Sequence, residues 1–300
     1  MKNILLFSLT IFVLFLSVQA DGFSEQEYKL YDSATGQALS LLEMADRLAD
    51  YDVVFFGEYH DDALIHSIES EILPFLYAKR ADMVISMEMF ERDVQSVVDS
   101  FLTSQIAEDR FLQKSRAWPN YISDYKNIVD FAVKNNLDVI AANVPRKYAA
   151  LINKKGISAL DSIPENEKKF TAKELKVLNN DYKIKFIETM TANMKSGSSK
   201  RMPMMRNSFD KIYAAQCLKD DTMAESVFQY LQSNPEKFII HYNGDFHSAS
   251  HLGTANKLRL LDKNLKIAVI SPVSIPEGEE INFVSDAKDQ GDFLMILHRK

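Results

Sequence analysis

The sequence predicts an α/β fold with a mostly parallel central sheet, helices on both faces, a helical insertion and an antiparallel C-terminal edge. Three observations predict it. Short apolar runs alternate with segments of helical spacing, several of these runs end abruptly in polar residues, and a long stretch in the second half lacks strand patterns. Parallel strands covered on both faces appear as continuous apolar runs, so the alternation indicates repeated strand and helix units.

The first half of the chain supplies most of these units. A turn-forming cluster at 32–36 predicts a short hairpin, and a helix over 42–50 follows. Apolar runs predict strands at 53–56, 83–87 and 137–142. Helical spacing predicts the connections at 63–80, 94–112 and 122–135. Strands in such short succession imply right-handed parallel crossovers.

The second half first departs from this pattern and then returns to it. Residues from about 149 to 234 show helical periods at 173–195 and 208–231, so we expect a helical insertion packed over the strand ends. The later elements are then expected to be strands at 238–242 and 266–271, a helix at 254–261, and an antiparallel pair at 281–284 and 293–297. Residues 21–300 would form one domain.

The first twenty residues have the features of a signal peptide. Lys2 provides a positive start, residues 4–16 are apolar but short for a membrane span, and Ala20 closes a small-residue cleavage site. We therefore expect an exported protein, periplasmic or secreted, that begins near Asp21. Because position 21 is not cysteine, the sequence lacks the lipobox cysteine that would carry a lipid anchor.

Composition excludes two classes of function. The 300 residues carry a formal net charge of -7 and no long basic run, so we expect no nucleic-acid partner. Cys217 is the only cysteine, which excludes an intramolecular disulfide and a zinc site built from several cysteines. Its helical context predicts a buried apolar role.

Polar clusters follow four of the predicted parallel strands. They are Glu58 with His60, Glu88 with Arg92, Asn143 with Arg146, and Asp245 with His247. Because the carboxyl ends of parallel strands lie on one edge of a sheet, we expect all four clusters to line one crevice. The sequence therefore predicts a ligand site there.

Each of these residues also has a structural interpretation. Glu58 and Glu88 would be structural if they paired with Arg92. His66, on the helix that follows His60, faces either the crevice or solvent. A histidine beside a strand end also serves often as a cap or as a hydrogen-bond partner in the core.

Five segments in order resemble the ChaN-like haem-binding proteins of the wider Tiki superfamily. They are Gly57-Glu-Tyr-His-Asp-Asp62, Glu88-Met-Phe-Glu-Arg-Asp-Val-Gln95, Trp118-Pro-Asn-Tyr121 with Tyr125, Ala142-Asn-Val-Pro-Arg-Lys-Tyr148, and Gly244-Asp-Phe-His247 with Gly253-Thr254. The resemblance runs from about residue 28 to the C-terminus. That family is commonly iron-regulated and exported, and it often carries the lipobox that this chain lacks.

The resemblance implies an exported haem-binding protein of an iron or haem uptake system. It implies a tyrosine oxygen on the iron, a histidine near a propionate, and cofacial haems between the protomers of a homodimer, with a membrane receptor as a further partner. The candidate haem-binding residues are His60, His66, Arg92, Tyr121, Tyr125, Arg146, Tyr148 and His247. The sequence does not select the iron ligand among the matched tyrosines, and Tyr59 and Tyr242 lie beside the two Gly-x-x-His turns.

A divalent-metal-dependent hydrolase, peptidase-like or esterase-like, is the alternative hypothesis. The wider superfamily includes such members with paired Gly-x-x-His turns. Here Glu58, His60, Glu88 and His247 would hold a divalent metal ion or act as catalytic residues, with one of them as a general base on water.

Overall fold

The computed structural model describes residues 28–192, 202–281 and 289–299. The predicted signal peptide, residues 1–20, and the predicted start of the mature chain lie outside these ranges. Most of the predicted strand at 281–284 also lies outside them. No helix within the described ranges is both long enough and apolar enough to cross a bilayer.

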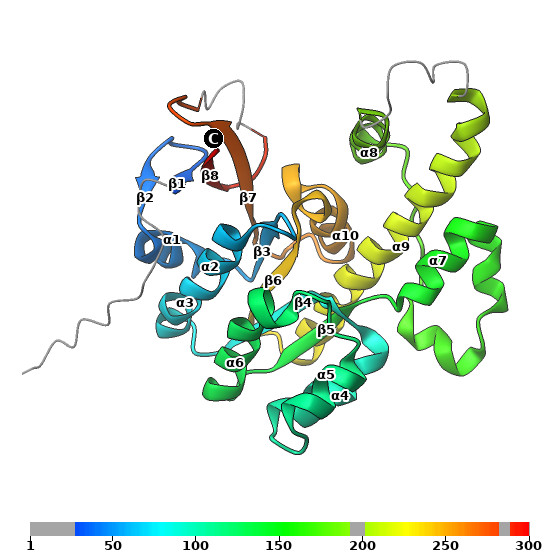
Figure 1. Cartoon of the computed structure of the whole chain (residues 1–300), viewed down its shortest axis with the longest axis horizontal. Helices are drawn as coiled ribbons and strands as arrows, with labels where there is room; N and C mark the ends of the chain where they lie inside the picture. The colour runs from blue at the N-terminus through cyan, green and yellow to red at the C-terminus, as the bar shows by residue number, and fades with distance from the viewer. Residues whose placement is uncertain (1–27, 193–201, 282–288, 300) are drawn as a thin grey trace, which may run out of the picture.

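A single sheet of eight strands forms the centre of the fold (Figure 1). Its order from one edge to the other is β2-β1-β8-β7-β3-β6-β4-β5. The strands are β1 Tyr28–Asp32, β2 Ala38–Leu39, β3 Val53–Glu58, β4 Met83–Glu91, β5 Val139–Asn143, β6 Phe238–Gly244, β7 Ile267–Pro276 and β8 Phe293–Arg299. The predicted α/β class is confirmed.

Strand directions divide the sheet into a parallel part and an antiparallel edge. The neighbours from β8 to β5 all pair in parallel, whereas β1 pairs antiparallel with both β8 and β2. The predicted hairpin at the start of the described chain is therefore present as β1 and β2. The C-terminal strand β8 takes part in the antiparallel edge through β1, and its other neighbour β7 runs parallel to it.

Helices cover both faces of the sheet (Figure 1). The α-helices are α1 Leu41–Leu48, α2 Ala63–Glu71, α3 Leu73–Lys79, α4 Gln95–Leu102, α5 Glu108–Ser115, α6 Lys126–Asn135, α7 Arg146–Lys155, α8 Asp181–Ala192, α9 Met202–Ser233 and α10 Gly253–Leu261. A π-helical turn, Tyr121–Tyr125, precedes α6. The part of the chain described between β5 and β6 contains helices and 3-10 turns but no strand.

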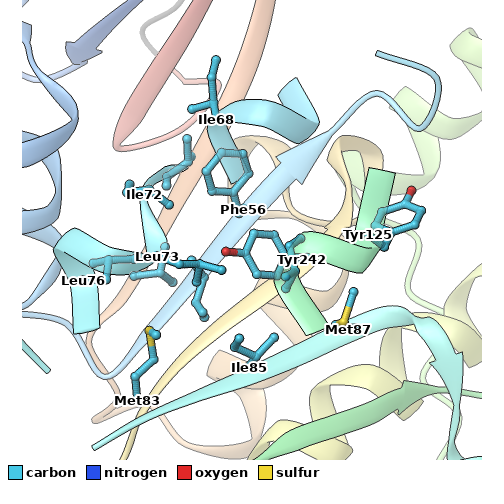
Figure 2. Close-up of a cluster of buried hydrophobic side chains, with 14 of the residues drawn as sticks. Phe56, Ile68, Ile72, Leu73, Leu76, Met83, Ile85, Met87, Tyr125 and Tyr242 are labelled. Carbon is cyan, nitrogen blue, oxygen red and sulfur yellow. The ribbon is translucent and has the colours of Figure 1, made fainter. Parts of the chain in front are cut away.

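Alternate residues of the parallel strands feed two separate cores. On one face Phe56 and Tyr242 pack with helices α2 and α3, as Figure 2 shows for Phe56, Ile68 and Ile72. On the other face Phe55 and neighbouring strand residues pack against α9 and α10. This alternation is expected when side chains of a strand point to opposite faces and both faces are buried.

Several predicted helices are shorter or divided, and local sequence explains why. The predicted helix at 63–80 divides at Ile72 because Pro74 has no N–H and is best accommodated in the first turn of a new helix, α3. The predicted helix at 94–112 divides into α4 and α5, with Ser104 at a φ of 56° between them. Residues 173–180 are not helical, and α8 begins at Asp181.

Arg92 anchors the long helix α9 to the end of β4. Its guanidinium donates to the Ser226 hydroxyl at 2.7 Å, to the Thr222 carbonyl at 2.8 Å and to Glu225 Oε1 at 3.0 Å. A further bond at 3.2 Å reaches the carbonyl of Thr171. These bonds use the donors of a fixed planar group, so a flexible lysine cannot reproduce them.

We therefore predict that Arg92→Lys lowers the free energy of unfolding by about 2 kcal/mol, because buried acceptors lose their partners. Urea unfolding followed by circular dichroism would measure the change. The matched control is Arg116→Lys, since Arg116 is about half exposed and pairs with Glu91 and Asp93 at the surface. That variant should lose less than about 1 kcal/mol. Equal losses in the two variants would contradict the anchoring role of Arg92.

Candidate functional site

Gly244, the last residue of β6, is where three parts of the predicted site meet. Its N–H donates to Glu88 Oε2 at 2.9 Å. A Cβ built on Gly244 would lie 2.7 Å from the Cε1 and Nε2 atoms of His60, so only glycine lets this imidazole approach the strand end. His247 follows one turn later. The structure thus brings His60, Glu88 and His247 to one place at the carboxyl edge of the sheet.

His60 is the exposed member of this group. Its Nδ1 lies 2.5 Å from Glu58 Oε1, its ring meets Trp118 edge to face at 4.9 Å between centroids, and 45% of its side chain is exposed. Burial alone would lower the pKa of His60, but the hydrogen bond with Glu58 and the negative charge of Glu88 outweigh it and raise that pKa. His60 therefore presents an anchored imidazole to ligands, and its surroundings favour the cationic form of the ring.

Glu58 supports His60 from inside the protein. Its side chain is fully buried, and its Oε1 also accepts the Tyr125 hydroxyl at 2.8 Å. The other oxygen, Oε2, has no hydrogen-bond partner among the residues described. Such a carboxylate fixes the ring orientation of a histidine, as it does in many catalytic and metal sites.

His247 is held between two buried carboxylates. Its Nδ1 lies 2.6 Å from Asp220 Oδ1, and its Nε2 lies 3.3 Å from Glu88 Oε1. Burial favours the neutral ring, yet the charges of Glu88 and Asp220 raise the pKa of His247 to about 9. Although burial opposes it, charged His247 lowers the pKa of Glu88 far below its usual value. Glu88 and His247 therefore both remain ionised at neutral pH.

Helix α9 contributes residues that sequence reasoning missed. Asp220 accepts from the Thr254 hydroxyl at 2.9 Å and from the Tyr182 hydroxyl at 2.8 Å, and Gln216 Nε2 lies 3.3 Å from the His247 ring. Lys219 on the same helix contributes positive charge that helps to lower the pKa of Glu88. The pair Asp220-Asp221 inside a helical pattern was the available signal, because buried carboxylates in a helix require partners.

His66 faces inward rather than towards solvent or the exposed part of the crevice. It is 4% exposed, its Nδ1 lies 2.8 Å from Glu69 Oε2, and its Nε2 lies 3.3 Å from the carbonyl oxygen of His60. Burial and the adjacent charge of Glu58 raise the pKa of Glu69 well above its usual value. His66 therefore faces neither the exposed part of the crevice nor solvent, but a buried cluster behind His60.

The three tyrosines of the matched motifs are buried. Tyr125 donates to Glu58, and Tyr148 donates to Glu167. Tyr121 packs against Phe90 and Phe111, and its hydroxyl has no hydrogen-bond partner within the described ranges. A porphyrin must reach its iron ligand. The hydroxyls of Tyr121 and Tyr125 are covered, whereas the bond from Tyr148 to Glu167 is only partly buried.

The remaining candidates differ in accessibility. Arg92 is engaged with α9, as described above, and Arg146 is exposed at the start of α7. Tyr242 is buried and donates to the carbonyl of Glu69, as does Tyr59 to the carbonyl of Pro272, but Tyr59 remains partly exposed. Tyr59 lines a surface pocket of about 520 Å³ together with Leu64 and Arg299.

Comparisons with solved structures agree with this fold. The chain is similar to the structure described as cofacial heme binding to ChaN of Campylobacter jejuni, with 18% identity and a TM-score of 0.70 over 92% of this chain and 98% of that chain. A mutant of the erythromycin esterase EreC in its open conformation gives a TM-score of 0.47 at 13% identity, over 90% of this chain and 83% of that chain. The first likeness shows the fold, and the second is too low to support an argument.

Sequence comparison is more specific. A search of curated proteins found no significant match. The model of a protein family described as haem-binding uptake, Tiki superfamily, ChaN matches residues 44–258. That range contains β3 to β6 and therefore Glu58, His60, Glu88 and His247. This chain belongs to the ChaN family of haem-binding uptake proteins in the Tiki superfamily.

Proposed function

We propose that this chain is an exported haem-binding protein of an iron or haem uptake system. The observation that carries the proposal is the family match over residues 44–258, which includes the whole carboxyl-edge cluster. The structure of the Campylobacter jejuni relative, described as binding haem cofacially, supports it. The predicted signal peptide supports export, and a periplasmic or secreted location follows from it.

The residues around His60 fit one side of a haem group. A propionate requires a cation, and the raised pKa of the exposed His60 supplies one. A porphyrin ring requires apolar surface, which partly buried Trp118 and 57% exposed Ile122 offer nearby. His247 does not take this role in our proposal, because it is buried between Glu88 and Asp220.

Tyr59 is the tyrosine we propose as the iron ligand. A phenolate is a hard oxygen donor that ferric haem accepts. Among the five tyrosines weighed from the sequence, Tyr59 alone is partly exposed, and it borders the pocket with Arg299. It also directly precedes His60 in the turn after β3. One haem could therefore meet an oxygen ligand and a propionate partner from neighbouring residues.

Cofacial binding would require a second copy of this chain. The Campylobacter jejuni protein is described as binding haem cofacially, and we propose that two haems stack between the protomers of a homodimer of this chain. A membrane receptor that receives or delivers the haem is the further partner expected for an uptake system.

A second candidate function is hydrolysis, and the contact between His60 and Glu58 favours it. An exposed imidazole whose Nδ1 is oriented by a buried carboxylate has the arrangement of a general base, with Nε2 left for a water molecule. The predicted metal set of Glu58, His60, Glu88 and His247 is less suitable as it stands, because a protonated His247 has no free lone pair for an ion.

The haem proposal predicts that Tyr59→Phe removes the charge-transfer absorption band of tyrosinate-bound ferric haem. The phenyl ring keeps the packing of Tyr59 but supplies no oxygen. Haem titration of the purified chain, followed by visible absorption, would measure the change. Tyr121→Phe is the matched control and should keep the band, since the Tyr121 hydroxyl is buried and has no hydrogen-bond partner among the residues described. The assignment of Tyr59 fails if the control loses the band and Tyr59→Phe keeps it.

Haem affinity should also depend on the charge of His60. The pKa of His60 is raised, so the cation is present at low pH and is lost as pH rises through that pKa. We expect the haem affinity of wild type to fall by about fivefold to tenfold as pH rises through this transition. The affinity of His60→Gln should lack this fall. Dissociation constants between pH 6 and 9 would show this difference, and His251→Gln should behave like wild type. Parallel pH profiles for wild type and His60→Gln would contradict the propionate contact.

The hydrolase candidate makes a separate prediction. If His60 is a general base, His60→Ala should lower ester hydrolysis by about a hundredfold or more. A panel of p-nitrophenyl esters, assayed with and without added Mn²⁺, would test it, with His251→Ala as the control. Hydrolysis that is absent from wild type, or unchanged in His60→Ala, would remove this candidate without affecting the haem proposal.

A further inference from the structure

We propose that Glu58, His66 and Glu69 form a buried binding site for a single divalent transition-metal ion. The three residues lie behind His60, on β3 and on helix α2. Each offers one ligand atom, and these atoms lie within 4.8 Å of one another. Glu58 also contacts His60 through its other oxygen, but the proposal does not depend on haem binding.

The distances suit an ion with short metal–ligand bonds. His66 Nδ1 lies 3.6 Å from Glu58 Oε2 and 2.8 Å from Glu69 Oε2. Ligands of a tetrahedral ion bound at about 2.1 Å are separated by about 3.4 Å. Small side-chain rotations would bring all three atoms to that spacing.

Two buried carboxylate oxygens at this site have no hydrogen-bond donor among the described residues. Glu58 Oε2 and Glu69 Oε1 lack a hydrogen bond within the part of the chain that is described, although both side chains are fully buried. Buried polar atoms in folded proteins nearly always have a partner, so each exception requires an explanation. The Glu58 and Glu69 carboxyl groups are close enough to share a proton. A metal ion between them would replace that proton and compensate both charges.

The surrounding residues orient the ligands as metal sites require. Tyr125 and His60 both bond to Glu58 Oε1, which leaves Oε2 for an ion. On His66 the second nitrogen, Nε2, lies 3.3 Å from the carbonyl of His60 and 3.7 Å from Asp124 Oδ2. A metal-binding histidine commonly donates its other N–H to a carbonyl or carboxylate, which fixes the tautomer.

The ligand types indicate the class of ion. One imidazole nitrogen with two carboxylates suits Mn²⁺, Fe²⁺, Co²⁺ or Zn²⁺. Calcium is unsuitable, because it takes six to eight oxygen ligands. The site differs from the set predicted from sequence, since it uses His66 and Glu69 in place of His60, Glu88 and His247.

A metal titration of the full chain tests this proposal. Chelator-treated protein would be titrated with Co²⁺, followed by visible absorption, and with Mn²⁺, followed by electron paramagnetic resonance. Wild type should bind one equivalent of either ion. Glu69→Gln and His66→Gln should bind at least about a hundredfold more weakly, and Asp124→Asn about tenfold more weakly, because it perturbs only the orientation of His66.

Two variants serve as matched controls. Glu71→Gln changes a carboxylate on the same helix that bonds to Ser67 instead, and His251→Gln changes a partly exposed histidine that pairs with Asp292. Both should bind metal like wild type. The proposal is overturned if folded wild type binds no equivalent, if Glu69→Gln binds as tightly as wild type, or if either control variant abolishes binding.

Haem binding distinguishes this proposal from the proposed function. Glu69→Gln keeps a hydrogen-bond donor for His66 Nδ1, so it should fold and bind haem like wild type. Should Glu69→Gln fail to fold, the wild-type stoichiometry and Asp124→Asn still decide the outcome. Metal binding without haem binding would support this site and contradict the haem proposal, and the reverse result would do the opposite.

Discussion

The mutual compensation of buried charges at Glu88, His247 and Asp220 is the interaction on which the carboxyl edge depends. Each of these side chains is almost completely buried, and none would be stable there alone. Together they form a chain from β4, through the turn after β6, to helix α9. Removing one member leaves uncompensated charge in the interior. The three segments must therefore keep their positions relative to one another. This requirement places α9 over the strand ends.

That arrangement explains why His60 is left for ligands. Glu88 contacts His247 with one oxygen and accepts from the Gly244 N–H with the other. Instead His60 is anchored by Glu58, and its ring lies over the open Cα of Gly244. The two Gly-x-x-His turns therefore have different roles. One histidine is a structural cation, and the other is an exposed, oriented group.

The sequence was sufficient to predict the parallel strands and the convergence of His60, Glu88 and His247. The reason is that the carboxyl ends of parallel strands lie on one edge of a sheet. The sequence was insufficient to predict the contacts that the long segment between β5 and β6 makes with the rest of the fold. Asp220 was missed because its partner is distant in sequence. Arg92 was predicted as a haem contact, whereas the structure engages its guanidinium with α9. Periodicity says which face of a helix is apolar, but not which strand end that helix will cover.

Glu58 connects the exposed and buried halves of the site. Its Oε1 serves His60 and Tyr125, while its Oε2 faces His66. A single carboxylate charge is shared between its two oxygens, so a cation on Oε2 would leave less negative charge on Oε1 for the His60 imidazole. The exposed histidine and the buried cluster are thus electrostatically linked through one side chain, whichever ligand the outer face binds.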